Sequence, residues 1–584
     1  MRRLFAVLWL LLPTVALASS PSDTLSNLLE EIWQYELKVS PTYATSMGVH
    51  DYDDQLADNS ADALAAQNRS YSAFLERLQA IDSAALTRSE QITVMMQQRR
   101  LQNYLDEYRF NAHFVPITSE YGFHSAIAML PQIARFKTAE DVSNYLKRLA
   151  AIGPYFDQQI AWMREGMKVN MVQPKAVLAG FEDSVQPFFE GSAEDSPFYT
   201  PLQSLPDAIG DAQQASLQAQ AREHIAQVVM PAYQRFYQFL VDEYIPQAKT
   251  GIAASQWPQG KAYYQNRAEY YTTTSLSADE IHAIGVEEVA RIRGEMQQVI
   301  DELGFEGDIN AFIHFLRTDP QFYAPSAQAL LKHAAYYSKK IDGLLPKLFY
   351  TLPRTPYGVA PVPESIAPKY TTGRYISPTR DDEPGYYWVN TYALDKRPLY
   401  AIPALTLHEA VPGHHLQISL AREMSDLPPV RRYTYISAFG EGWGLYSEYL
   451  GKEIGFYETP YDEFGRLSYE MWRACRLVVD TGMHMKGWTR QQALDYMMEN
   501  TALSAHNVKT EIDRYISWPA QALSYKIGEL EIKRLRQLAE QRLGERFDLR
   551  AFHDAVLAHG SVPLSVLADN IEQFIQQHQG TPSH

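Results

Sequence analysis

Cysteine is nearly absent from this sequence, which has a single one, Cys475, among 584 residues. One cysteine excludes both a disulfide framework and a zinc cluster built from thiolates. Positive charge is also scarce, because 52 Lys and Arg face 69 Asp and Glu and leave a formal net charge of −17. This balance argues against nucleic-acid binding, which needs clustered Lys and Arg to contact phosphates. Any metal must therefore be held by histidines and carboxylates, and Cys475 is expected to be buried rather than nucleophilic.

Long hydrophobic runs are missing, apart from a short one at the N-terminus. Arg2 and Arg3 precede an apolar run from Leu4 to Leu12, and small residues follow up to Ala18. This pattern is typical of a cleaved secretory signal, whereas the run is too short to cross a bilayer comfortably as an anchor. No cysteine follows that could carry a lipid. We expect a signal peptide at residues 1–18, cleaved after Ala18, and a soluble periplasmic or secreted protein without a membrane span.

Helical periodicity dominates the rest of the chain. A Pro-rich, aromatic stretch from Leu352 to Pro398 interrupts it, and residues 385–391 within this stretch have the bulky composition of a strand. Capping boxes are predicted at Ser277 and Thr489. The clearest helical segments are Thr24–Leu37, Asp62–Ile81, Ala139–Met167 and the patterns between Leu405 and Phe574. The sequence predicts a mainly α fold with a small β-sheet beside the helix that contains His408, which we expect to be the active-site helix.

The predicted domains are an N-terminal helical lobe at residues 19–250 and a C-terminal metal-binding lobe at residues 251–584. We expect the two lobes to form one folding unit with the site in the cleft between them. The sequence makes no prediction about the oligomeric state.

The segment from His408 to His415 reads His-Glu-Ala-Val-Pro-Gly-His-His. A zinc-binding His-Glu-x-x-His helix places two histidines four residues apart on one face, beside a general-base Glu. Here Pro412 occupies that fourth position, and His414 would point about 240° away from His408 on a straight helix. Pro412 lacks a backbone donor, and Gly413 permits backbone angles that other residues resist. We therefore predict a two-residue bulge that brings His414 to the metal, with His415 as the alternative ligand.

A catalytic zinc needs a third protein ligand and an open position for water. Glu441, 441 − 414 = 27 residues after His414, lies among Gly, Trp, Leu and Tyr residues that favour a buried helix face. Because a buried carboxylate needs a partner, we predict that Glu441 is the third ligand. Glu448 lies seven residues later on the same face and is expected to support a ligating His. The alternative is that both acids are solvated surface charge.

These motifs resemble the bacterial family known as domain of unknown function 885. The resemblance is carried by the segments His408–Gln417, Gly440–Glu448, Asp480–His484, Arg514–Tyr515 and Pro519–Gly528. That family is similar to helical zinc oligopeptidases of the thimet oligopeptidase and carboxypeptidase Taq kind, whose His-Glu-x-Gly-His is two residues shorter. The resemblance implies a large helical zincin-like, gluzincin oligopeptidase-like fold and zinc-dependent peptidase activity.

Zinc at this site would lower the pKa of bound water toward about 7, and Glu409 is the predicted general base. By resemblance, Tyr525, Tyr515 and His484 are candidates to stabilise the oxyanion. His484 has an alternative role, because it forms an i, i+4 helix pair with Asp480 that is compatible with a structural hydrogen bond.

Two further residues are candidates for substrate binding. Arg514 is suited to a bidentate contact with a substrate carboxylate, although pairing with Asp513 or Glu511 is equally compatible with the sequence. Asn390, at the end of the predicted strand, is a candidate to hold the backbone of an extended peptide that pairs with this strand's edge. The alternative is an ordinary core strand.

The sequence therefore predicts an exported zinc-dependent peptidase-like hydrolase that cleaves peptide bonds, with oligopeptides as substrates. Two alternatives stay open. One is a zinc hydrolase of another amide or ester bond, and the other is a non-catalytic exported helical binding protein whose zinc has four protein ligands, including His415.

Overall fold

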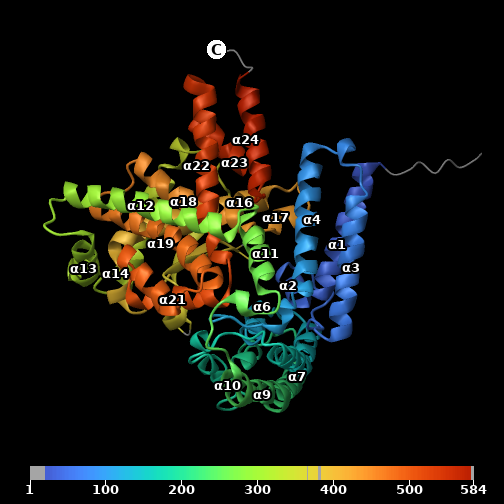
Figure 1. Cartoon of the computed structure of the whole chain (residues 1–584). Helices are drawn as coiled ribbons and strands as arrows, with labels where there is room; N and C mark the ends of the chain where they lie inside the picture. Colours follow the sequence, from blue (N-terminus) through green and yellow to red (C-terminus); the bar gives the residue numbers. More distant parts are fainter. Residues whose placement is uncertain (1–19, 365, 379–382, 580–584) are drawn as a thin grey trace, which may run out of the picture.

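The computed structural model describes residues 20–364, 366–378 and 383–579. The predicted signal peptide lies outside the described residues. The predicted mainly helical fold with a small sheet is confirmed (Figure 1), and so are the capping boxes at Ser277 and Thr489. None of the helices among the described residues combines the length and the apolar character that crossing a membrane requires.

Three long N-terminal helices stand beside the rest of the molecule, at the blue end of Figure 1. Their apolar residues, such as Leu28, Phe74 and Leu101, form a small core separate from the main one. Polar contacts join these helices to the main body, including the ion pair of Arg267 with Glu107 at 3.0 Å. The helices of this group are α1 (Pro21–Val39), α3 (Ala61–Gln79) and α4 (Arg88–Arg109), with the short α2 (Pro41–Ser46) after α1.

The remaining helices share one hydrophobic core. This core contains residues from both sides of position 250, such as Phe156, Tyr233, Ile292 and Trp443, so packing is continuous across the predicted lobe boundary. The earlier part contains α5 (Phe123–Ile127), α6 (Leu130–Ile133), α7 (Ala139–Lys168), α8 (Asp211–His224), α9 (Met230–Phe239) and α10 (Ile245–Gln247). The later part begins with α11 (Gly260–Thr272), α12 (Ala278–Glu302), α13 (Ile309–Thr318) and α14 (Ala327–Asp342). It continues with α15 (Ile402–Glu409), α16 (His414–Glu423), α17 (Pro429–Tyr433), α18 (Ser437–Glu453), α19 (Pro460–Met485), α20 (Arg490–Asn500), α21 (Ala505–Ser517), α22 (Ser524–Leu543), α23 (Leu549–Leu557) and α24 (Leu564–Gln579).

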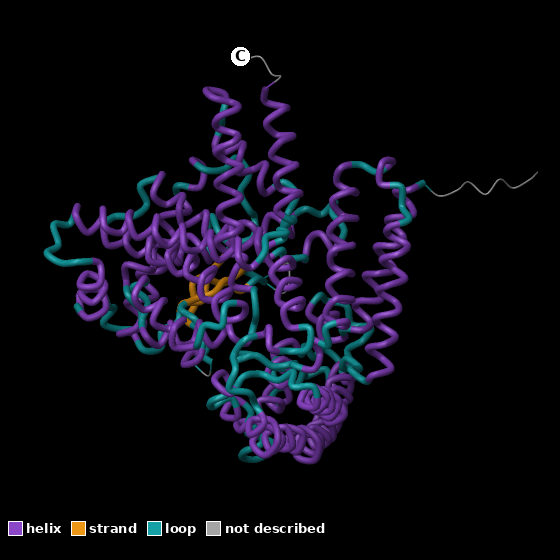
Figure 2. The backbone as a smooth tube through the Cα atoms, in the orientation of Figure 1, coloured by secondary structure: helices purple, strands orange, loops and turns teal. Residues whose placement is uncertain are grey.

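A three-stranded sheet lies within the helical body (Figure 2). Its strands are β1 (Tyr357–Pro361), β2 (Gly373–Ile376) and β3 (Gly385–Val389). The order is β1-β3-β2, with β1 parallel and β2 antiparallel to β3. The strand predicted at residues 385–391 is confirmed as β3. It is the central strand, however, so the prediction that its edge pairs with a peptide is wrong, and β2 is the edge strand beside α15.

Helices α18 and α22 approach each other closely through glycines. A Cβ on Gly528 would lie 1.9 Å from the carbonyl oxygen of Ala438, and a Cβ on Gly442 would lie 2.5 Å from the backbone of Gly528. Any larger side chain must therefore push the two helices apart. This contact matters for the site because α18 carries Glu441 and Glu448, and α22 carries Tyr525.

We predict that Gly528→Ala lowers the free energy of unfolding by about 1–3 kcal/mol, the usual effect of overpacking a core. Gly294→Ala is the matched control, because Gly294 lies in α12 with open space around it, and alanine there should stabilise the helix by up to roughly 1 kcal/mol. Thermal and denaturant unfolding followed by circular dichroism measures both. Equal stability of the two variants would contradict the close contact.

Candidate metal centre

The helix that carries His408 stops at Glu409, and a new helix starts at His414. In the turn between them, the N–H of Gly413 donates to the carbonyl oxygen of Leu407 at 3.0 Å, and the N–H of His415 donates to that of Ala410 at 3.0 Å. The predicted departure from a straight helix is confirmed. Its form differs from a bulge inside one continuous helix, because four residues separate α15 from α16.

Glycine is required in this turn. A Cβ on Gly413 would lie 1.9 Å from the carbonyl oxygen of His408, so the backbone could not fold back this tightly with any other residue. The indole N–H of Trp443 donates to the carbonyl oxygen of Pro412 at 2.7 Å and ties the turn to α18. The turn therefore depends on both local sequence and a distant helix.

Three side chains converge at the turn, as the sequence predicts. Oε2 of Glu441 lies 3.6 Å from Nε2 of His408 and 3.4 Å from Nε2 of His414, and one ligand atom from each residue lies within 4.8 Å of the others. Ligands about 2.0–2.1 Å from a tetrahedral zinc are about 3.3–3.4 Å apart, so this spacing fits a shared ion. The donor set of two imidazoles and one carboxylate is also a zinc set.

Glu448 fixes the orientation of His408. Its Oε1 lies 2.8 Å from Nδ1 of His408, and the carboxylate is almost fully buried. This contact places the hydrogen of the neutral ring on Nδ1 and turns Nε2 toward Glu441, as in carboxylate–histidine–metal arrangements. The guanidinium of Arg473, 3.4 Å from the same carboxylate oxygen, offsets part of the buried negative charge. The predicted supporting contact of Glu448 is confirmed.

His415 points away from this group, so its prediction as an alternative ligand is wrong. Its Nδ1 lies 3.0 Å from the hydroxyl of Tyr375, and its Nε2 lies 3.0 Å from the carbonyl oxygen of Thr355. Both ring nitrogens are thus engaged with the sheet region, where burial lowers the pKa of His415 to about 4. The neutral imidazole of His415 therefore connects α16 to the sheet region through hydrogen bonds.

The electrostatics of the cluster favour a cation. Burial alone would lower the pKa of His408, but the carboxylates of Glu441 and Glu448 raise it to about 9. Burial alone would likewise raise the pKa of Glu441, but His414 and His408 hold it well below its usual range. Glu441 is therefore ionised, and positive charge is strongly favoured beside it.

These residues open into a cavity of about 450 Å³, called the metal cavity below, within the range of small-ligand sites. Glu409 lines this cavity, and its Oε2 accepts a hydrogen bond from the backbone N–H of Tyr375 in β2 at 2.7 Å. Tyr525 lines it as well, with its ring nearly parallel to that of His408 at a centroid distance of 6.4 Å. A carboxylate and a phenol therefore share one cavity with the three converging side chains.

Comparisons with known proteins place the chain in a family. The sequence model of the family described as "Bacterial protein of unknown function (DUF885)" matches residues 41–571. The chain belongs to this family. No curated protein matches it.

Two solved structures resemble this DUF885 chain along nearly their whole length. One is described as a "putative lipoprotein" from Colwellia psychrerythraea, with 30% sequence identity and a TM-score of 0.89, covering 96% of this chain and 100% of that one. The other is described as a "putative lipoprotein of unknown function" from Shewanella oneidensis, with 19% identity and a TM-score of 0.68, covering 94% of this chain and 99% of that one. The second likeness shows the fold alone.

Two of the predicted catalytic residues lie outside the metal cavity of this DUF885 chain. The fully buried hydroxyl of Tyr515 accepts hydrogen bonds from Trp472 at 2.8 Å and Arg476 at 2.6 Å. His484 bonds the carbonyl oxygen of Tyr515 at 3.0 Å through Nε2 and accepts from the N–H of Ala254 through Nδ1. Their prediction as oxyanion donors is therefore wrong, because these hydrogen bonds hold them in the wall behind the cavity.

The two predicted substrate contacts also have different surroundings from those expected. The buried amide of Asn390 donates to the carbonyl oxygens of Ala367, Tyr370 and Thr371, so the prediction that it holds a peptide is wrong. Arg514 does line the metal cavity, but its guanidinium already binds Glu511 and Gln521. Cys475 is fully buried as predicted, and burial raises the pKa of its thiol.

Many residues of this cavity were not predicted from the sequence, and Arg374 and Tyr435 are two examples. Arg374 in β2 lines it and contacts the hydroxyl of Tyr121 at 3.0 Å. Tyr435 lines it beside His414, with a ring centroid distance of 6.2 Å. Neither belongs to a recognisable motif. The one available signal was the position of Tyr435 just before the helix that carries Glu441.

We predict that the purified protein holds about one zinc per chain. His408→Ala, His414→Ala and Glu441→Ala should each lose most of it, because each removes a converging ligand atom. His415→Ala is the matched control next to His414 and should keep its zinc. Elemental analysis by mass spectrometry measures the content, and retention in His414→Ala with loss in His415→Ala would contradict the assignment.

Zinc affinity should also rise with pH until about 9 and then level off. Below that pH a proton occupies His408 and must leave before Nε2 can coordinate, so acid weakens binding. Competition with a chelator across neutral to alkaline pH measures this dependence. An affinity independent of pH over this range would contradict the raised pKa of His408.

Proposed function

We propose that this protein is an exported zinc-dependent hydrolase that cleaves peptide bonds of oligopeptides. The observation that carries the proposal is the convergence of His408, His414 and Glu441, with Glu409 facing the same cavity. Zinc held by these three residues would supply an activated water and polarise the carbonyl of the substrate. Three protein ligands leave a coordination position open, as in catalytic zinc sites.

Each remaining residue has a role that its position supports. Glu409 accepts the proton of the attacking water and passes it to the leaving amine. The N–H of Tyr375 holds one oxygen of Glu409 in place, so that the other oxygen can exchange the proton. Tyr525 donates its phenolic hydrogen bond to the oxyanion that forms on the substrate carbonyl.

The sheet supports a peptide as substrate. Gly373, Arg374 and Tyr375 of the edge strand β2 line the metal cavity. An extended peptide can lie along such an edge and form main-chain hydrogen bonds regardless of its sequence. The His408–His414 motif resembles that of helical zinc oligopeptidases, which supports peptide hydrolysis as the reaction. A zincin-like fold of this chain is therefore part of the proposal.

Export is supported by two independent features. The basic and apolar N-terminal sequence up to Ala18 has the pattern of a secretory signal. The two structural relatives are each described as a "putative lipoprotein", and lipoproteins are a class that belongs to the cell envelope. This chain differs from a lipoprotein in one respect, because Ser19 and not a cysteine directly follows Ala18, and its single cysteine is the buried Cys475 in α19.

We predict that Glu409→Gln keeps its zinc but loses peptide hydrolysis by about 100-fold or more, since it removes a base and not a ligand. A peptide library treated with the mature protein, with and without a chelator, identifies a peptide that is cleaved only without the chelator. This peptide is the substrate for the assay. N-acyl amino acids and esters tested alongside separate peptidases from other zinc hydrolases. Wild-type turnover by the variant would dismiss Glu409 as the base.

Tyr525→Phe should lower kcat by about 100-fold with little change in KM or zinc content, because the hydroxyl acts only when the oxyanion forms. Tyr515→Phe is the comparison, because that hydroxyl lies outside the cavity and its loss should mainly affect stability. A larger loss of kcat in Tyr515→Phe than in Tyr525→Phe would overturn these roles.

A further inference from the structure

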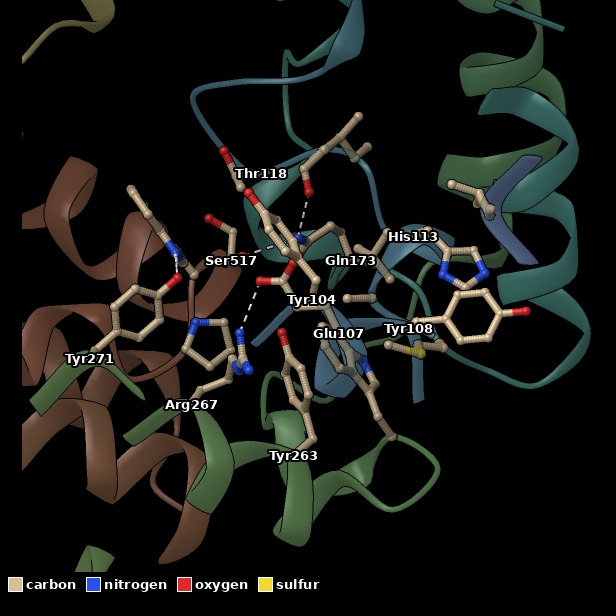
Figure 3. A pocket seen from close by; sticks show the side chains of 18 of the residues that line it. Tyr104, Glu107, Tyr108, His113, Thr118, Gln173, Tyr263, Arg267, Tyr271 and Ser517 are labelled. Carbon is tan, nitrogen blue, oxygen red and sulfur yellow. Dashed lines mark hydrogen bonds and ion pairs between the residues drawn. The ribbon is translucent and has the colours of Figure 1, made fainter. Parts of the chain in front are cut away.

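A second cavity of about 410 Å³ adjoins the metal cavity. It lies where α3 and α4 meet α11 and the end of α21. Figure 3 shows that side chains of α4, α11 and α21 point toward it. Tyr271 and Trp518 line both cavities, and the indole N–H of Trp518 donates to the hydroxyl of Tyr271 at 2.7 Å. This pair is the shared wall. We call the second space the aromatic cavity.

The composition of the aromatic cavity is that of a ligand site and not of a core. Its aromatic side chains are tyrosines, tryptophans and His113, and no phenylalanine is among the described residues that line it, although the chain has 24. Tyr and Trp combine an apolar face with a polar group and are favoured where one side of a residue must meet a ligand or water. Trp518 is 37% exposed, so this residue of the shared wall is partly accessible to solvent.

Charge in the aromatic cavity is balanced. Glu107 and Arg267 face each other at 3.0 Å, visible as a dashed line in Figure 3. Amide and hydroxyl side chains, including those of Asn68, Thr118 and Gln173, supply the remaining polar groups. Gln173 is 1% exposed and donates to the carbonyl oxygens of Ile117 and Ser517. These hydrogen bonds connect the segment of Ile117 with the end of α21. Such a lining suits neutral, apolar side chains attached to a polar backbone, rather than phosphate or carboxylate groups.

We propose that the aromatic cavity is a second binding site for the peptide substrate. It takes a segment with aromatic or apolar side chains while the adjoining segment lies in the metal cavity, and the chain passes the Trp518–Tyr271 wall. This proposal rests on the proposed function, because the shared lining of Tyr271 and Trp518 places the aromatic cavity next to the proposed site of hydrolysis. It predicts a preference for substrates too long for the metal cavity alone.

Asn68→Trp tests the proposal by filling the aromatic cavity from α3. Its matched control is Arg69→Trp, because the neighbouring Arg69 is exposed and does not line the cavity. The probes are an octapeptide rich in Phe and Leu that the wild type cleaves, and a tripeptide containing the same scissile bond. Asn68→Trp should raise KM for the octapeptide about tenfold and leave kcat for the octapeptide unchanged. For the tripeptide, both KM and kcat should stay unchanged. Arg69→Trp should change none of these. Equal effects on both substrates, or none, would overturn the proposal.

A second variant and a binding measurement separate this proposal from the proposed function. Tyr108→Ala removes a ring from the cavity and should raise the same KM even if Asn68→Trp folds poorly. Isothermal calorimetry of the octapeptide with Glu409→Gln, alone and combined with Asn68→Trp, needs no turnover. Lack of peptide hydrolysis by the wild type would refute the proposed function. In that case, the aromatic cavity is supported as a peptide site if the octapeptide binds and Asn68→Trp weakens this binding. The proposal is overturned if the octapeptide does not bind or if Asn68→Trp leaves its binding unchanged. Binding of a chito-oligosaccharide in place of the peptide would also overturn it.

Discussion

The structure of the site depends on the way His408 is held between two carboxylates of one helix. Glu448 bonds Nδ1, and Glu441 faces Nε2, so α18 contacts both nitrogens of the ring. The two acids are seven residues apart and share a helix face, which is why one helix can do this. The same helix supplies Trp443, which fixes the turn that brings His414 into place. A small displacement of α18 would disturb all of these contacts together.

Burial makes this arrangement favourable for a cation. Carboxylates inside a protein are stable only when a positive charge or several donors compensate them. Arg473 partly compensates Glu448, whereas His408 and His414 compensate Glu441. Behind the site the same rule holds, because the fully buried Lys526 lies within 2.8 Å of carboxylate oxygens of Glu288 and Glu470 and pins α22 to α12 and α19. The buried ion pairs of α22 and its glycine contact with α18 together set the position of Tyr525.

The sequence predicted the convergence of His408, His414 and Glu441, because the histidine motif and the helical spacing of the acids are local features. The His408–His415 segment shows where a straight helix must fail, and the spacing of Glu441 and Glu448 needs only helical periodicity. The sequence could not predict that β3 lies at the centre of the sheet and β2 at one edge, since β2 is four residues long and its pairing with β3 is set by long-range contacts. His484 and Tyr515 were misassigned because a motif does not reveal that distant groups, such as Ala254, already occupy their polar atoms. The aromatic cavity is made of residues from about 64 to 519 in the chain and leaves no pattern in the sequence.

X-ray absorption at the zinc edge of the purified protein tests the central claim most directly. The account predicts four light-atom ligands at about 2.0–2.1 Å, of which two scatter as imidazole rings and the others as oxygen. Sulfur in the coordination shell, a third imidazole, or no bound zinc would contradict the assignment of His408, His414 and Glu441 as the metal ligands.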